Sequence, residues 1–121
     1  MKTKNLYLHF FNLQQVVHSK EQPHIDLESR KILENIAWHY ESGKALSVTE
    51  VMDLSHIASA ATIHRKLDLL RDLGLIKSIH LGENRRTKYM APTKLSSHYF
   101  DSLSKLMLKT IKSHQKMANV V

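Results

Sequence analysis

Apolar residues recur every three or four positions in five stretches of this sequence, the spacing that gathers them on one face of an α-helix. The sequence predicts helices at about residues 4–17, 26–43, 47–52, 59–73 and 94–117. Another stretch, residues 75–90, is rich in β-branched residues and partly alternates between apolar and polar positions, which is typical of strands. We therefore predict a mainly α-helical protein with one small β-hairpin.

Polar residues that favour helix starts stand before four of these helices. Asp26 and Ser59 are good N-caps because their side-chain oxygens can accept hydrogen bonds from free amides of the first turn. Ser47 and Glu50 have the spacing of a capping box, in which each side chain accepts from the other residue's amide. Thr93 can cap the last helix. The two short helices at 47–52 and 59–73, joined by a turn, form a helix-turn-helix.

The second helix is predicted to bury one face and to end at Gly43. The polar stretch before it, residues 19–24, contains Pro23 and is predicted to be a connector. Trp38 and His39, late on the helix, are expected to pack with partial exposure rather than to form a ligand site. The apolar positions expected on the buried face are Leu27, Leu33, Ile36, Ala37 and Tyr40.

The helix at 59–73 divides sharply into two faces. Ile63, Leu67 and Leu70 fall on one stripe, whereas small and hydrogen-bonding residues lie around the outside of its first turns. Taken alone, this pattern is typical of any amphipathic helix that packs on a core. However, the helix follows a short capped helix and continues, after Gly74, into strands at 75–81 and 86–90, with a turn at 82–84. This order favours a DNA recognition helix followed by a β-wing, and Pro92 ends the strand pairing because it has no amide to donate.

The terminal helices carry apolar stripes that a chain of 121 residues has little core left to cover. We expect them to pair two copies of the chain, although a monomer that folds them onto itself is the alternative. A lysine face on the last helix is expected to be solvated. The apolar positions are Leu6, Phe10, Leu13 and Val17 in the first helix, and Leu95, Tyr99, Leu103, Leu106, Met107 and Ile111 in the last. The lysines are Lys105, Lys109, Lys112 and Lys116.

The charge balance favours a polyanionic partner. Lysines and arginines outnumber acidic residues by 18 to 11, for a net charge of +7. The absence of cysteine excludes disulfides and thiolate metal sites, and a reducing cytoplasm is the expected location. Polar residues interrupt the apolar N-terminus, and no stretch approaches the roughly 20 apolar residues that span a bilayer. The nine histidines lack the helical spacing of a metal site, and no cofactor motif, nucleophile pattern or other enzymatic signature is present.

Two groups of residues are candidates for contacting nucleic acid. Arginine is the commonest bidentate reader of guanine, and free amides at a helix start bind phosphate oxygens. The first group, at the start of the recognition helix, is Ser59, Ala60, Ala61, Thr62, His64 and Arg65. The second, on the wing, is Arg85, Arg86 and Lys88. Alternatives remain for both: Arg65 could pair with Asp68 or Asp72 within the chain, and the wing could be an ordinary solvated turn.

These motifs together resemble the winged-helix transcription regulators of the MarR family. The matching residues are Leu73-Gly74-Leu75-Ile76 at the start of the wing, Asn84-Arg85-Arg86 at its tip, and Thr93 nine residues after Asn84. In the family pattern an aspartate stands where this sequence has Asn84, and it commonly braces one of the arginines. The resemblance covers about residues 27–95 through its motifs, and the terminal helices by position only.

The resemblance implies a winged helix-turn-helix with N- and C-terminal dimerisation helices, acting as a homodimer on pseudo-palindromic double-stranded DNA. The chain would divide into residues 1–25 and 94–121 for dimerisation and residues 26–93 for DNA binding. It also implies a small-molecule effector that the sequence does not place; Tyr7, Phe11, Trp38 and His39 are candidates, although such aromatic residues are more often core. The alternative function is a winged-helix module of plasmid or phage replication or of protein docking.

Overall fold

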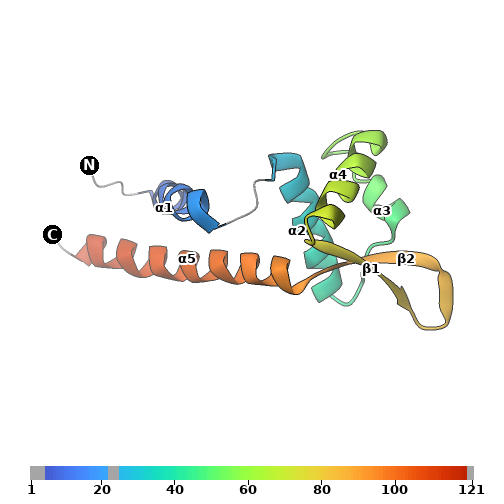
Figure 1. Ribbon diagram of the computed structural model, residues 1–121. Coiled ribbons are helices and arrows are strands. Elements are labelled where there is room, and N and C mark those ends of the chain that lie inside the picture. Colours follow the sequence, from blue (N-terminus) through green and yellow to red (C-terminus); the bar gives the residue numbers. More distant parts are fainter. Residues whose placement is uncertain (1–4, 22–24, 120–121) are drawn as a thin grey trace. The chain divides into compact units, whose positions relative to one another are not determined.

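The computed structural model describes residues 5–21 and 25–119, and its elements are shown in Figure 1. The chain folds as two compact units, one made of residues 1–23 and 98–121, the other of residues 24–97. The elements are α1 (Leu6–Glu21), α2 (Leu27–Glu41), α3 (Val48–Met52), α4 (Ala60–Asp72), β1 (Ile76–Leu81), β2 (Asn84–Pro92) and α5 (Lys94–Asn119). The mainly helical fold with one β-hairpin is confirmed.

The helix starts lie where the capping residues predict. The Asp26 and Ser59 side chains accept hydrogen bonds from the amides of Ser29 and Thr62, at 2.8 and 3.3 Å. Ser47 and Glu50 form the full capping box, with both reciprocal bonds present. The amide of Ser47 holds the pKa of the Glu50 carboxyl below its usual value, because it donates to the charged form. These local bonds satisfy amides that no helical carbonyl can reach.

The core of the unit at residues 24–97 lies between α2 and α4, with α3 and the hairpin closing its sides. Isoleucine and leucine side chains from both helices are fully buried there and exclude water from the contact. Met90 of β2 and Leu75, just before β1, join them. The helix residues of this core are Ile32, Leu33, Ile36, Ile63, Leu67 and Leu70.

The predicted buried face of α2 was wrong at two positions. Leu27 is 65% exposed and Tyr40 is 44% exposed, while Ile32, not among the predicted positions, is fully buried. Leu27 lies on the far side of the helix from Ile32 and Leu33, because 3.6 residues per turn place it a third of a turn or more away from each. Tyr40 is on the correct side but near the C-terminal end of α2.

The wing is a two-stranded antiparallel hairpin that is longer than its apolar pattern predicts. Its strands turn over Gly82 and Glu83, and Gly82 has φ +62°, which favours glycine. The second strand runs over 84–92 rather than 86–90, since polar residues near the tip still pair. The loop before α3 makes one isolated bridge to β2, where the Leu46 carbonyl accepts from the Met90 amide at 2.8 Å.

The side chains of Thr93 and Ser96 fix the base of the wing. The Thr93 hydroxyl donates to the Gly74 carbonyl at 2.6 Å, which joins the two ends of the hairpin. Thr93 also caps α5 as predicted, because its hydroxyl accepts from the Ser96 amide while the Ser96 hydroxyl accepts from the Thr93 amide. Gly74 has φ +74°, a conformation that ends α4 and starts the strand.

The other unit consists of α1 and the part of α5 from His98 onward. Helix α1 continues to Glu21, so the predicted connector at 19–24 was wrong for residues 19–21. Residues 22–24 lie outside what the structure describes, and so does the side chain of Val17, which was predicted to be on the apolar stripe. Leu106 and Thr110 are buried, and Phe10 and Leu13 are half-buried. The four lysines Lys105, Lys109, Lys112 and Lys116 are exposed, as expected.

Much of the apolar surface of this unit is not covered by its own residues. A groove of about 220 Å³ opens between the helices, lined by Leu6, Tyr7, Phe10, Met107, Thr110 and Ile111. The large apolar side chains that are exposed here are Leu6, Tyr7, Leu8, Phe11, Val16, Met107, Leu108 and Ile111. Within the described residues, no helix is both long enough and apolar enough to cross a membrane.

Candidate nucleic-acid interface

The exposed start of α4 carries a chain of hydrogen bonds. The Ser59 hydroxyl donates to the Thr62 hydroxyl at 3.0 Å, and the Arg65 guanidinium donates to the same oxygen at 3.2 Å. Arg65 forms no ion pair with Asp68 or Asp72, so the intramolecular alternative for this arginine is not what the structure contains. Ala60 and Ala61, which precede Thr62, are small and exposed, and leave room for another molecule to approach the helix backbone.

The next turns of α4 differ, because a carboxylate neutralises their cations. Asp68 lies 3.7 Å from the His64 ring nitrogen Nδ1 and 3.2 Å from Arg71 Nη1. All three side chains are about half exposed, so these pairs contribute little to stability. Their effect is on the surface charge: Asp68 offsets the charge of Arg71, and that of His64 when its ring is protonated, whereas Arg65 has no acidic partner among the described residues.

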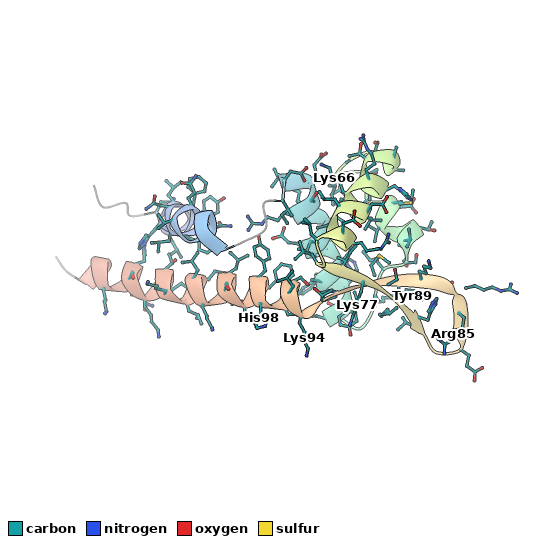
Figure 2. The ribbon with its side chains drawn as sticks, in the orientation of Figure 1. Lys66, Lys77, Arg85, Tyr89, Lys94 and His98 are labelled. Atoms are coloured by element: carbon teal, nitrogen blue, oxygen red, sulfur yellow. The ribbon has the colours of Figure 1, made fainter. Side chains whose placement is uncertain are left out.

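A further cation of α4 was not predicted as functional. Lys66 reaches the Asp26 carboxylate at the start of α2, forty residues earlier in the chain (Figure 2). The Lys66 ammonium, with the Ser29 amide, lowers the Asp26 pKa from 3.8 to about 2 by stabilising the charged carboxylate. No sequence signal links these two residues, since their proximity depends on how α2 packs against α4.

The wing carries cations without a neutralising partner. Arg85, Arg86 and Lys88 are exposed and form no ion pair within the described residues, and Arg85 lies near the tip of the hairpin in Figure 2. The hairpin spans residues 76–92, and Glu83 is its one acidic residue. Clustered cations of this kind favour a phosphate backbone or a narrow minor groove as their ligand.

Asn84 shapes the wing tip through its amide group. Its side-chain oxygen accepts from the backbone amides of Arg86 and Thr87, at 3.0 and 3.4 Å. Its nitrogen donates to the Thr87 hydroxyl at 3.1 Å. This is an Asx turn, which fixes the backbone that carries the arginines. An aspartate would instead add a negative charge here, so Asn84 braces the backbone and leaves both guanidinium groups available.

The aromatic candidates for an effector site are divided between the two units. Tyr7 and Phe11 belong to the unit containing α1, whereas Trp38 and His39 belong to the other unit. Trp38 is 69% exposed, and His39 Nδ1 lies 2.8 Å from the Asn35 carbonyl one turn earlier. Across residues 5–21 and 25–119, no group of three histidine, aspartate or glutamate side chains has a metal-binding arrangement.

Comparison with known proteins identifies relatives by structure but not by sequence. No family model and no curated protein matches the sequence. Among solved structures, the heme sensor PefR from Streptococcus agalactiae in complex with heme is 16% identical, with 96% of this chain and 75% of that chain aligned and a TM-score of 0.57.

Two further structures match over a similar length. FabT from Streptococcus pneumoniae in complex with DNA is 16% identical over 96% of this chain and 73% of its own, with a TM-score of 0.55. ZitR from Lactococcus lactis, a zinc-responsive member of the MarR family, is 13% identical over 96% and 83%, with a TM-score of 0.52. At this level of identity the comparison establishes a shared fold, the winged helix-turn-helix with helical extensions.

Proposed function

We propose that this chain is a MarR-type transcriptional regulator that binds double-stranded DNA in a sequence-specific manner as a homodimer. The observation that carries the proposal is the presence, on one unit, of a recognition helix with exposed donors at its start and a wing with unneutralised arginines. A module that docks only to proteins has no need for both features. The fold shared with FabT, which has been solved in complex with DNA, supports the same function.

In this proposal, the first two turns of α4 enter the major groove. Arg65 reads a base edge, and its bond to Thr62 limits the conformations of its long side chain before binding, which reduces the entropy lost on contact. Ser59 and the free amides at the helix start bind a phosphate, favoured by the helix dipole. Ala60 and Ala61 permit close approach, and His64 contacts the groove wall.

The wing supplies contacts that depend little on sequence. Arg85 and Arg86 extend to the minor groove or the phosphate backbone, and Lys88 contributes from the second strand. Each phosphate that the wing neutralises releases counterions, so binding weakens as salt is added. The Asn84 amide keeps the tip of the wing ordered for this contact.

The homodimer rests on the apolar surface that α1 and α5 leave exposed. Eight large apolar side chains of this unit are exposed in the single chain, which is far more than isolated surface residues on a soluble monomer. A second copy of the same unit is the occupant we propose, because a two-fold interface lets each apolar face cover its equivalent. The groove between α1 and α5 would receive side chains of the partner copy.

Selection of bound duplexes from a random pool, followed by sequencing, tests the function. We expect an enriched pseudo-palindrome with half-sites about one helical turn apart. Affinity for the enriched duplex should fall steeply between 50 and 200 mM salt, by roughly a thousandfold for six phosphate contacts. Failure to enrich any duplex, or affinity independent of salt, would rule out the proposed function. A small-molecule effector remains a prediction without an assigned site.

A further inference from the structure

One ion pair in the described part of the chain joins two secondary-structure elements. The other pairs connect residues three or four positions apart on the same helix, whereas Lys66 of α4 pairs with Asp26 at the start of α2. An arginine or lysine on a recognition helix is ordinarily assigned to the DNA backbone. Here the geometry places the cation toward the protein.

The two carboxylate oxygens of Asp26 have separate roles. Oδ1 accepts from the Ser29 amide and caps α2, while Oδ2 receives the Lys66 ammonium. The positive end of the α2 dipole also favours a carboxylate at this position. Asp26 is therefore held by its own helix, and it presents the second oxygen as a fixed acceptor for a residue on another element.

Lys66 occupies the edge of the buried stripe of α4. It precedes Leu67 and follows Ile63 by three residues, both of which are buried in the contact with α2. Its side chain is 22% exposed, less than that of its partner or of any other side chain in an ion pair of the described residues. The stem packs along the helix contact and only the ammonium meets the carboxylate.

We propose that Lys66 is a positioning residue: its pair with Asp26 sets the orientation of α4 on α2, and Lys66 does not contact DNA. This inference rests on the proposed DNA-binding function. Ser59 lies seven residues before Lys66, so a rise of 1.5 Å per residue makes a lever of about 10 Å. A tilt of the helix by about ten degrees at Lys66 would thus move its start by nearly 2 Å.

Contacts to bases are more sensitive to such a tilt than contacts to phosphates. Bidentate bonds to a base edge need donor and acceptor in a narrow range of distances and angles. Phosphates attract long flexible cations over several ångströms and accept from many directions. Loss of the pair should therefore lower the ratio of specific to non-specific affinity. Loss of folding or of a phosphate contact would instead weaken binding to both kinds of duplex and leave this ratio nearly unchanged.

Two substitutions remove the pair from either side. Asp26→Asn retains a good capping oxygen for α2 and removes the charge, and Lys66→Met retains the apolar stem. For each, we expect affinity for the selected duplex to fall up to roughly fivefold, in keeping with the small contribution of a half-exposed ion pair, while affinity for unrelated duplex is unchanged. The double variant should be no weaker than either single variant, because both remove the same interaction.

The matched control is Arg71→Met, which removes a cation of the same helix that pairs only within α4. It should leave the affinity ratio unchanged. Thermal unfolding of every variant establishes that the chain is folded at the assay temperature. Each affinity is measured across a salt series on the selected duplex and on one unrelated duplex.

Two results would overturn the inference while the proposed function stands. If Lys66→Met weakens binding to both duplexes alike and lowers the salt slope by about two, one for each copy in the homodimer, Lys66 contacts a phosphate. If both variants bind as the unchanged chain does, the pair does not position α4. If the unchanged chain selects no duplex at all, the proposed function itself fails and this inference with it.

Discussion

The two units of this protein differ in how far they bury their apolar side chains. In the unit at residues 24–97, the isoleucines and leucines at the α2–α4 contact are fully buried. In the unit made of α1 and the C-terminal part of α5, most large apolar side chains are exposed, including Tyr7 and Leu108 at 69% and 60%. The first has its own core, whereas the second leaves much of its apolar surface exposed.

The difference indicates a division of labour between folding and assembly. A unit with its own core can hold a recognition helix in a fixed position without a partner, which base recognition requires. In the proposed homodimer, the exposed apolar face of the other unit is covered by a second copy, which would link the stability of that unit to association. In our proposal, one unit determines which sequence is bound, and the other determines that two copies bind together.

The largest expected effect comes from removing a side chain of the self-contained core. Leu33→Ala leaves a cavity at a fully buried position, which should lower the free energy of unfolding by about 3 kcal/mol. The matched control is Leu27→Ala on the same helix, where 65% exposure predicts a change within about 0.5 kcal/mol. Urea titrations measure both changes. Similar losses of the free energy of unfolding for the two leucines would contradict the assignment of Leu33 to the buried face of α2 and of Leu27 to its exposed face.

A charge placed on the open face should affect assembly. Ile111→Asp inserts a carboxylate into the groove between α1 and α5, where a partner copy would have to bury it. We expect the dissociation constant of the dimer to rise by at least a hundredfold, about 2.7 kcal/mol. Sedimentation velocity measures this change. Lys109→Asp, at an exposed position on the lysine face, is the control, and equal effects of the two would refute the proposed interface.

Removal of the wing cations should weaken all DNA binding without altering assembly. Arg85→Ala combined with Arg86→Ala should reduce affinity for selected and unrelated duplexes alike, by roughly tenfold at physiological salt, and reduce the salt slope by about four, because the homodimer loses four arginines. Fluorescence anisotropy across a salt series checks this. If the double variant retained the original slope, the wing would not contact phosphates. Sedimentation should meanwhile show no change in dimer stability.

The smallest expected effect is the acid sensitivity of the Asp26–Lys66 pair. The Asp26 pKa is lowered to about 2 in the folded protein, so the pair stabilises fully above the ordinary value near 3.8 and this contribution is lost as the pH falls toward 2. Asp26 is half exposed, so solvent screening limits the contribution to less than about 1 kcal/mol. Urea titrations of Asp26→Asn between pH 2 and pH 5 should show a weaker pH dependence; an unchanged dependence would contradict the pair's role.

Local features of the fold were predictable from the sequence. Ser47 and Glu50 identify their helix start because a capping box is complete within four residues, and Gly74 identifies the end of α4 for a similar reason. The buried stripe of α4 follows from three residues at helical spacing. These features depend on near neighbours, which the sequence displays directly.

Other features depend on packing that a local pattern does not contain. The exposure of Leu27 follows from which face of α2 meets α4, and the single helical pattern does not set that direction uniquely. The pairing of Lys66 with Asp26 depends on the same contact. The role of Asn84 is of the same kind: the family's aspartate commonly braces an arginine, whereas the Asn84 side chain accepts from the backbone amides of Arg86 and Thr87, and no local pattern in the sequence indicates these bonds.

The stoichiometry of the protein on a selected duplex tests the central claim most directly. Sedimentation equilibrium of the chain with its enriched pseudo-palindrome measures how many 14.0 kDa chains one duplex holds. We predict two chains on each duplex. Without DNA, at micromolar concentration, the protein should also have the mass of two chains. One chain per duplex, with a monomer in solution, would contradict the account of two units with separate roles in DNA recognition and assembly.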